Sequence, residues 1–151
     1  MSTKKKDSIK IRPMTRSDIH AVLILDRKIG KGRGILSYKD MAATDPGGPL
    51  DLSFVAVDKD TVIGFIMTRL AYLMIPFTEV CIIQGMLIDS QYQGRGIGGQ
   101  LLHGLLDHCY AEGINTIRAL IPDNNRDLKN FFEAHGFRRS TIVNFDKTIE
   151  S

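Results

Sequence analysis

The sequence predicts a mixed α/β domain whose central sheet is mostly antiparallel and flanked by helices. Residues 52–57 and 61–69 are rich in β-branched and aromatic side chains and are joined by a short polar turn, which is typical of a β-hairpin. Residues 80–88 form a nearly continuous apolar run, as expected for a strand covered on both faces. A glycine-rich stretch, 94–99, then leads into helical spacing of apolar residues over 101–110. Antiparallel strands followed by a strand–helix–strand unit favour a mixed sheet over an all-parallel one.

The chain before the hairpin predicts one strand and two helices. Residues 9–13 alternate between apolar and polar side chains and end at a proline, which predicts a first strand. Ser17 is a suitable N-cap for a helix that ends near residues 29–30. A short second helix is expected over 37–41. Residues 45–49 are rich in proline and glycine and are expected to form a loop.

Two features interrupt the strands in the middle of the chain. Residues 70–78 contain Pro76 and are expected to form the end of a strand and a loop. Gln84-Gly85 interrupts the apolar run and predicts a β-bulge or a close approach of another backbone.

The last third of the chain predicts a strand, a helix and a closing edge strand. Gly113 is expected to end the helix that follows the glycine-rich stretch, and residues 116–121 form the next strand. Residues 123–125 are expected to cap a last helix that ends at Gly136. Residues 141–145 are expected to form an edge strand.

Composition places the chain among ordinary globular proteins of one domain. It has 151 residues, 43% hydrophobic and 25% charged, with a net charge of +3. Residues 1–8 are expected to form a disordered basic tail, and 9–151 a single domain. The sequence has no arginine-rich stripe with interleaved aromatics, so no nucleic-acid partner is expected.

The two cysteines, Cys81 and Cys109, lie in apolar segments. Their spacing matches no metal-binding motif, so no metal site is expected. The N-terminus has no apolar signal segment, and no apolar run is long enough to span a membrane. A cytoplasmic protein with free thiols is the simplest interpretation, although the spacing leaves a disulfide between the two cysteines open.

The glycine-rich stretch predicts a site for an anion. Its glycines, at 94, 96, 98 and 99, allow a tight turn and a close approach to a ligand. The first turn of the next helix offers unpaired N–H groups and the positive end of the helix dipole, which suit a phosphate or pyrophosphate.

Three alternatives compete with a specific phosphate site. A purely structural turn stays open. A P-loop is excluded, because no Gly-Lys-Ser/Thr follows. A dinucleotide fingerprint is formally present at Gly94, Gly96 and Gly99, with Asp123 as the ribose-binding acid, but too little chain follows for a doubly wound domain.

Two separated motifs resemble those of the GNAT superfamily of N-acyltransferases. Gln91-x-x-Gly94-x-Gly96, between an apolar strand and a Leu-Leu helix, resembles the acetyl-CoA signature of that family. Residues 125–137 resemble a later family segment that ends in Gly-Phe. The resemblance runs from about residue 9 to 145. It implies a GNAT-type sheet whose fourth and fifth strands splay apart, and transfer of an acetyl group from acetyl-CoA to a primary amine of a small molecule or protein.

The resemblance also implies which residues hold coenzyme A. The backbone of 94–99 would bind the pyrophosphate, the strand edge at 86–88 would pair with the pantetheine, and N–H groups freed at the bulge would polarise the thioester carbonyl. The implied cofactor-binding residues are Met86, Leu87, Ile88, Gln93, Gly94, Arg95, Gly96, Ile97, Gly98, Gly99, Asn125 and Phe132.

The catalytic groups are less apparent. The acceptor amine must lose a proton before it attacks, and Glu79 is the candidate base. Many family members have a tyrosine acid where this chain has Phe132. Either the thiolate leaves unprotonated, or Tyr92, Tyr38 or His135 donates a proton, or the protein is a non-catalytic acyl-CoA-binding module. The resemblance also allows a homodimer formed through the last strands.

Overall fold

The computed structural model describes residues 8–29, 48–74 and 77–150. These residues form two compact units, one up to Leu120 and the other from Ile121 onward, and each unit is described by itself. The helix expected over 37–41 lies outside the described residues. None of the helices in the described ranges is long and apolar enough to cross a membrane.

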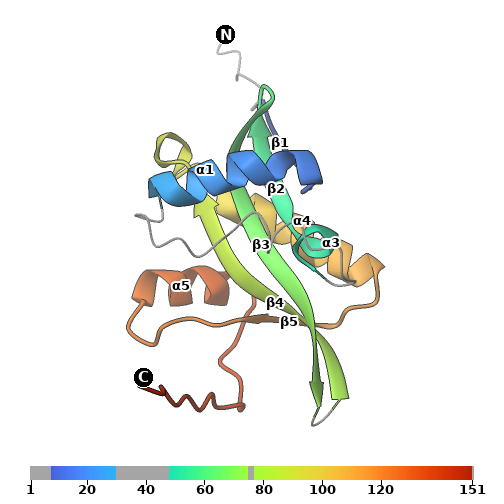
Figure 1. Cartoon of the computed structure of the whole chain (residues 1–151), viewed down its shortest axis with the longest axis vertical. Coiled ribbons are helices and arrows are strands. Elements are labelled where there is room, and N and C mark those ends of the chain that lie inside the picture. Colours follow the sequence, from blue (N-terminus) through green and yellow to red (C-terminus); the bar gives the residue numbers. More distant parts are fainter. Residues whose placement is uncertain (1–7, 30–47, 75–76, 151) are drawn as a thin grey trace. The chain divides into compact units, whose positions relative to one another are not determined.

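The first unit contains a five-stranded sheet in the described part of the chain, with its strands in chain order (Figure 1). Neighbouring strands are antiparallel except for the last two, which are parallel. This confirms the predicted mixed sheet. It also rules out the dinucleotide interpretation, which requires a parallel doubly wound sheet. The strands are β1 (Ile9–Pro13), β2 (Phe54–Asp58), β3 (Thr61–Met74), β4 (Phe77–Ile88) and β5 (Thr116–Ala119).

Two hairpins join β2, β3 and β4. The predicted β2–β3 turn is present, with positive φ angles at Lys59 and Asp60, as in the tight turns that match the twist of a hairpin. The second hairpin is longer than the sequence predicts. Residues 70–74 continue β3 because they pair with β4, in register from Leu70 opposite Cys81 to Met74 opposite Phe77. The segment 70–78, expected to be the end of a strand and a loop, is therefore strand up to Met74 and again from Phe77.

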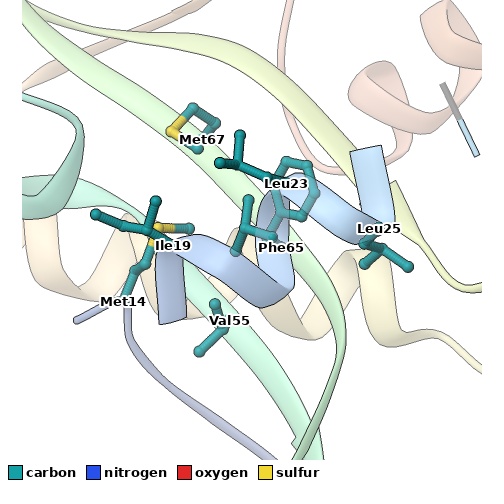
Figure 2. Close-up of a cluster of buried hydrophobic side chains, with 8 residues drawn as sticks. Met14, Ile19, Leu23, Leu25, Val55, Phe65 and Met67 are labelled. Carbon is teal, nitrogen blue, oxygen red and sulfur yellow. The ribbon is translucent and has the colours of Figure 1, made fainter. Parts of the chain in front are cut away.

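Helices cover both faces of this sheet (Figure 1). Helix α1 (Ile19–Ile29) packs on one face. Helix α4 (Ile97–Ala111) and the short helix α3 (Pro49–Leu52) lie on the other face, and α3 occupies the start of the segment expected to be strand. Figure 2 shows the core under α1, where side chains from the helix meet the strands. Each such side chain stabilises the fold by roughly 2 kcal/mol. The cluster comprises Met14, Ile19, Val22, Leu23, Leu25, Val55, Phe65 and Met67.

A buried carboxylate organises the start of α1. A single 3₁₀ turn, Arg16–Asp18, precedes the helix, and Thr15, not the predicted Ser17, caps it. Asp18 accepts a bond of 2.8 Å from the Thr15 N–H and two bonds, of 2.6 and 2.8 Å, from the Arg12 guanidinium. Ser17 fails as a cap because it lies inside the extra 3₁₀ turn. The bidentate pair joins β1 to the start of α1.

The second unit contains helix α5 (Arg126–Ala134). The Asn125 side chain caps it as predicted, accepting a bond of 3.1 Å from the Leu128 N–H, and Gly136 follows it with a φ of 87°. The strand predicted over 141–145 is absent. A strand needs a hydrogen-bonded neighbour, and none of the described strands pairs with this segment, whose Phe145 is 92% exposed.

Candidate functional site

A β-bulge at Gln84 divides β4 into a lower half, residues 77–83, and an upper half, residues 85–88. In the ladder with β3, Met67 lies opposite Gly85 and Thr68 lies opposite Ile83, so Gln84 has no partner in the register. This confirms the bulge that Gln84-Gly85 predicts. The extra residue increases the local twist and bends the strand.

Strand β5 leaves β4 at the same place. The parallel ladder runs from Val80 opposite Thr116 to Ile83 opposite Ala119, immediately before the bulge. In the described part of the chain, residues 85–88 pair with β3 on one side and with no strand on the other. The pairing of strands 4 and 5 therefore stops at the bulge, where the resemblance places their splay. An unpaired edge of this kind offers backbone N–H and C=O groups to an extended ligand.

The glycine turn continues directly from this free edge. After a 3₁₀ turn at Ser90–Tyr92, Gly94 and Gly96 adopt φ angles of 79° and 76°, which are strained for other residues. Gly96 is the N-cap of α4, and because it has no side chain it makes no cap hydrogen bond to the first turn of the helix. The N–H groups of Ile97, Gly98 and Gly99 therefore lie at an uncapped helix N-terminus, where they can bind an anion.

Two side chains from other elements and one side chain of the turn itself hold the turn in place. The Tyr92 hydroxyl donates a bond of 2.6 Å to Asp58 at the end of β2, which raises the pKa of Tyr92. The Nζ atom of Lys28, at the end of α1, lies 3.4 Å from the Oδ2 atom of Asp89. The Gln93 amide donates a bond of 3.2 Å to the Ile88 carbonyl, which ties the turn back to the strand. Sequence reasoning missed Asp58 and Lys28, because no local pattern connects positions so far apart.

Arg95 is the exposed cation of this turn. Its guanidinium stacks on the Tyr92 ring, 5.0 Å from the ring centroid. Tyr92 is thus occupied on its face by Arg95 and at its hydroxyl by Asp58. Tyr92, one of the three proton donors considered from the sequence, therefore helps to hold the turn in place.

A family model gives the decisive comparison. The model described as the acetyltransferase (GNAT) family matches residues 26–137. The chain belongs to this family. It is therefore an acyltransferase whose cosubstrate is acetyl-CoA and whose acceptor is an amine, and the resemblance seen in the sequence is confirmed.

Solved structures of similar fold include other acetyltransferases. An aminoglycoside N-acetyltransferase in complex with CoA matches with a TM-score of 0.79 at 16% identity, over 97% of this chain and 99% of that one. A possible acetyltransferase from Clostridium difficile 630 matches with a TM-score of 0.78 at 17% identity, over 95% and 99%. A ribosomal-protein-alanine N-acetyltransferase from Brucella melitensis biovar Abortus 2308 matches with a TM-score of 0.73 at 11% identity, over 93% and 99%.

The structure of this GNAT protein brings most of the predicted cofactor residues together. Met86, Leu87 and Ile88 form the free edge, and residues 93–99 form the turn that follows it. The fit to coenzyme A is good, because an extended edge ends at an uncapped helix N-terminus. Asn125 and Phe132 belong to the second unit, where the Asn125 oxygen caps α5 and Phe132 is buried among aromatic rings.

The candidate catalytic residues lie elsewhere. Glu79 is half-buried near the start of β4 and lines a pocket of about 370 Å³ on the face covered by α4. It precedes the bulge at Gln84 by five residues, or about 17 Å of strand. His135 lies in the second unit, with its Nδ1 atom 2.8 Å from the Phe131 carbonyl oxygen. Tyr38 lies outside the described residues.

Proposed function

We propose that residues 86–88 and 93–99 bind acetyl-CoA and that the acetyl group passes to a primary amine at the bulge in β4. One observation carries the proposal. The end of the pairing with β5, the bulge and the glycine turn follow one another along residues 83–99. The edge suits the amide-bearing arm of coenzyme A, and the helix N-terminus suits its pyrophosphate. Arg95 adds a positive charge at the same end.

The backbone of the bulge would stabilise the transition state of the acetyl transfer. Acetyl-CoA supplies the acetyl group as a thioester, a carbonyl compound that an amine can attack. Backbone N–H groups freed beside Gln84 and Gly85 would donate hydrogen bonds to the carbonyl oxygen as negative charge develops on it. Losing one such donor costs on the order of a hundredfold in rate in comparable sites.

We retain Glu79 as the proposed base, and its position defines how it would act. Because it lies about 17 Å along the strand from the bulge, it would receive the proton through water or from a long acceptor. We expect Glu79→Gln to lower kcat/KM at least tenfold at neutral pH, with less effect at high pH, where the amine is already neutral. An unchanged pH–rate profile would remove Glu79 from the mechanism.

We also keep Asn125 and Phe132 as proposed cofactor-binding residues. Phe132 donates no proton, so the thiolate is proposed to leave without a general acid. Phe132→Tyr should then raise kcat by less than about threefold. A rise of a hundredfold would mean that the natural chain lacks an essential acid and acts mainly as an acyl-CoA-binding module.

The acceptor proposed for a first screen is an amine of an aminoglycoside or of a peptide. Both classes follow from the names of structures that share this fold. We also propose a cytoplasmic homodimer that binds no nucleic acid. The exposed apolar side chains of Val143, Phe145 and Ile149 support a second copy as the partner. Sedimentation equilibrium would show the dimer, and a monomer at all concentrations would exclude it.

The cofactor proposal is tested by calorimetric titration with CoA and by a matched pair of glycine variants. Gly96 and Gly113 have nearly equal φ angles, 76° and 75°, and a Cβ atom at either would meet open space. They lie at opposite ends of α4. Gly96→Glu should weaken CoA binding at least a hundredfold, because it places a negative charge at the anion site. Gly113→Glu should leave CoA binding unchanged.

Two results would overturn the proposal. Equal effects of the two glycine variants would show that backbone strain, not the position, governs binding. Tight binding of NADH in place of CoA would show that the turn holds a different cofactor.

A further inference from the structure

A buried serine lies where three strands of the sheet meet. Ser53 follows helix α3 directly, precedes β2, and is 1% exposed. Its carbonyl accepts a bond of 2.8 Å from the N–H of Met14, the residue after β1. Its hydroxyl accepts a bond of 2.9 Å from the N–H of Thr68 on β3. Ser53 therefore joins the end of β1, the start of β2 and the middle of β3.

The hydroxyl replaces a backbone partner that β2 does not provide. The last rung of the β2–β3 ladder pairs Phe54 with Ile66, and the chain before Ser53 forms α3. Thr68 lies two residues beyond that rung and is 0% exposed. A buried N–H group without a partner destabilises a fold, and the Ser53 oxygen supplies the partner here.

The same hydroxyl lies close to both polar groups of the Thr68 backbone. Besides accepting from the N–H, its oxygen lies 3.4 Å from the Thr68 carbonyl oxygen and 3.6 Å from the Met67 sulfur. The hydroxyl can donate its one hydrogen to either acceptor. One side chain thus fixes the edge of Thr68 that faces β2.

Thr68 lies across from the bulge in β4. The ladder between β3 and β4 shifts its register between Met67 and Thr68, and Gln84 is left without a partner. In an extended strand the N–H and C=O groups of one residue point to one side, and those of its neighbours point to the other. Since the polar groups of Thr68 point toward β2, those of Met67 and Arg69 point toward β4, on either side of the bulge.

We propose that Ser53 is a positioning residue for the acetyl transfer, because it fixes the part of β3 that holds the bulge in place. This inference rests on the proposed function, in which backbone N–H groups beside Gln84 polarise the thioester carbonyl. Such donors work when they are aimed at the place where charge develops, and a misplacement of about 1 Å can cost a hundredfold in rate. Ser53 is not among the proposed cofactor-binding residues, and it acts through β3 and the bulge.

The place of Ser53 in the sheet predicts that binding and polarisation of acetyl-CoA can be separated. Residues 86–88 pair with residues 64–66 of β3, and these pair in turn with residues 54–56 of β2. The proposed pantetheine edge is therefore held by a continuous backbone ladder. The bulge lies beyond the last rung of that ladder, where the Ser53 hydroxyl supplies the bond. Loss of the hydroxyl should disturb the bulge and leave the edge intact.

The test is the infrared spectrum of acetyl-CoA bound to the full-length protein, recorded as a difference between unlabelled acetyl-CoA and acetyl-CoA isotopically labelled at the acetyl carbonyl carbon. Hydrogen bonds to a carbonyl oxygen weaken its double bond, so wild type should lower the stretching frequency relative to free acetyl-CoA. Ser53→Ala should lose at least half of that shift. Ser53→Cys should do the same without opening a cavity, because sulfur is a weak acceptor. The dissociation constant of acetyl-CoA should change by less than about threefold in both variants.

Thr15→Ala is the matched control. It removes a hydroxyl that donates a bond of 3.0 Å to Asp18 in the turn before α1. It should lower the melting temperature by a few degrees, as Ser53→Ala does, and leave the carbonyl frequency unchanged.

A second measurement needs no ligand. In a proton–nitrogen NMR spectrum of the protein alone, the amide signal of Gly85, which follows the unpaired residue of the bulge, should move in both Ser53 variants. The amide signal of Gly136, which lies after α5 in the second unit, should not move.

The outcomes separate this inference from the proposed function. Ser53→Cys with the wild-type carbonyl frequency, or with an unmoved Gly85 signal, would overturn the positioning role. An equal loss of the frequency shift in Thr15→Ala would assign the effect to general destabilisation and overturn that role as well. Wild type that binds acetyl-CoA at the free carbonyl frequency would instead contradict the bulge donors of the proposed function, and the Gly85 signal would then decide whether Ser53 holds the bulge.

Discussion

The two halves of β4 have the same strand geometry and opposite roles. In the lower half, Val80 and Cys81 are 0% exposed, and the strand pairs with β3 on one side and β5 on the other. In the upper half, residues 85–88 are only half-buried and pair with β3 alone within the described chain. The lower half belongs to the core, and the upper half belongs to the proposed cofactor site.

The difference between the halves comes from one extra residue. Gln84 shifts the register with β3, and the ladder with β5 ends at the residue before it. A one-residue shift exchanges the faces to which side chains point. A single bulge can therefore change a core strand into a binding edge without a break in the chain.

Deletion of Gln84 should have the largest effect on the difference between the two halves of β4. Without the extra residue, one half of β4 must slip in register and turn its apolar side chains to the wrong face. We expect a loss of about 3 kcal/mol in the free energy of unfolding, and CoA binding weakened at least a hundredfold. Denaturant melts and calorimetric titration measure the two effects. Gln84→Ala, which keeps the residue count, is the control and should change both little; a deletion variant with normal CoA affinity would show that the bulge is dispensable.

Two matched isoleucine truncations distinguish the halves. Ile83, in the lower half, is 7% exposed, and Ile88, in the upper half, is only partly buried. We expect Ile83→Ala to cost about 3 kcal/mol in the free energy of unfolding and Ile88→Ala about 1 kcal/mol, because the cavity is larger where the site is closed. Urea melts measure both. Equal losses would mean that the halves do not differ in packing.

The Asp18 carboxylate lies outside both halves of β4, in the 3₁₀ turn before α1. Burial alone would raise the pKa of Asp18, but the bonds from Arg12 and Thr15 outweigh it and lower the pKa. The carboxylate therefore stabilises the fold fully above its ordinary pKa of 3.8, and this stability is lost as the pH falls through the lower folded value.

Asp18→Ala should accordingly cost about 2 kcal/mol at pH 7 and make the melting temperature less sensitive to acid. Calorimetry between pH 7 and pH 2 measures both effects. CoA affinity at pH 7 should not change, since Asp18 bonds to Arg12 and Thr15 and is not among the proposed cofactor-binding residues. Equal acid sensitivity in wild type and variant would assign the acid response to other carboxylates.

The smallest expected effect concerns the charge at the end of the upper half. Arg95→Ala should weaken CoA binding about threefold at low salt and less at high salt, because an exposed guanidinium is screened by ions. The melting temperature should stay the same. Lys10→Ala removes an exposed charge on β1 and should leave CoA affinity unchanged. An identical effect of the two variants would show that Arg95 acts only through the net charge of the protein.

Features governed by neighbouring residues could be predicted from the sequence. The β2–β3 turn, the caps at Asn125 and Gly113, and the bulge at Gln84 all follow from local chemistry. Errors arose where pairing decided the outcome. Residues 70–74 extend β3 because β4 pairs with them. Residues 141–145 form no strand because none of the described strands pairs with them.

The sequence by itself determined the glycine turn, the apolar stripe of α4 and the family to which the chain belongs, since each depends on residue type and spacing along the chain. Only the tertiary structure decided where the pairing of β5 with β4 ends, and that Tyr92 bonds to Asp58 across 34 positions. The physical reason is that these contacts join elements brought together by burial of apolar surface, which fixes distances that local spacing leaves open.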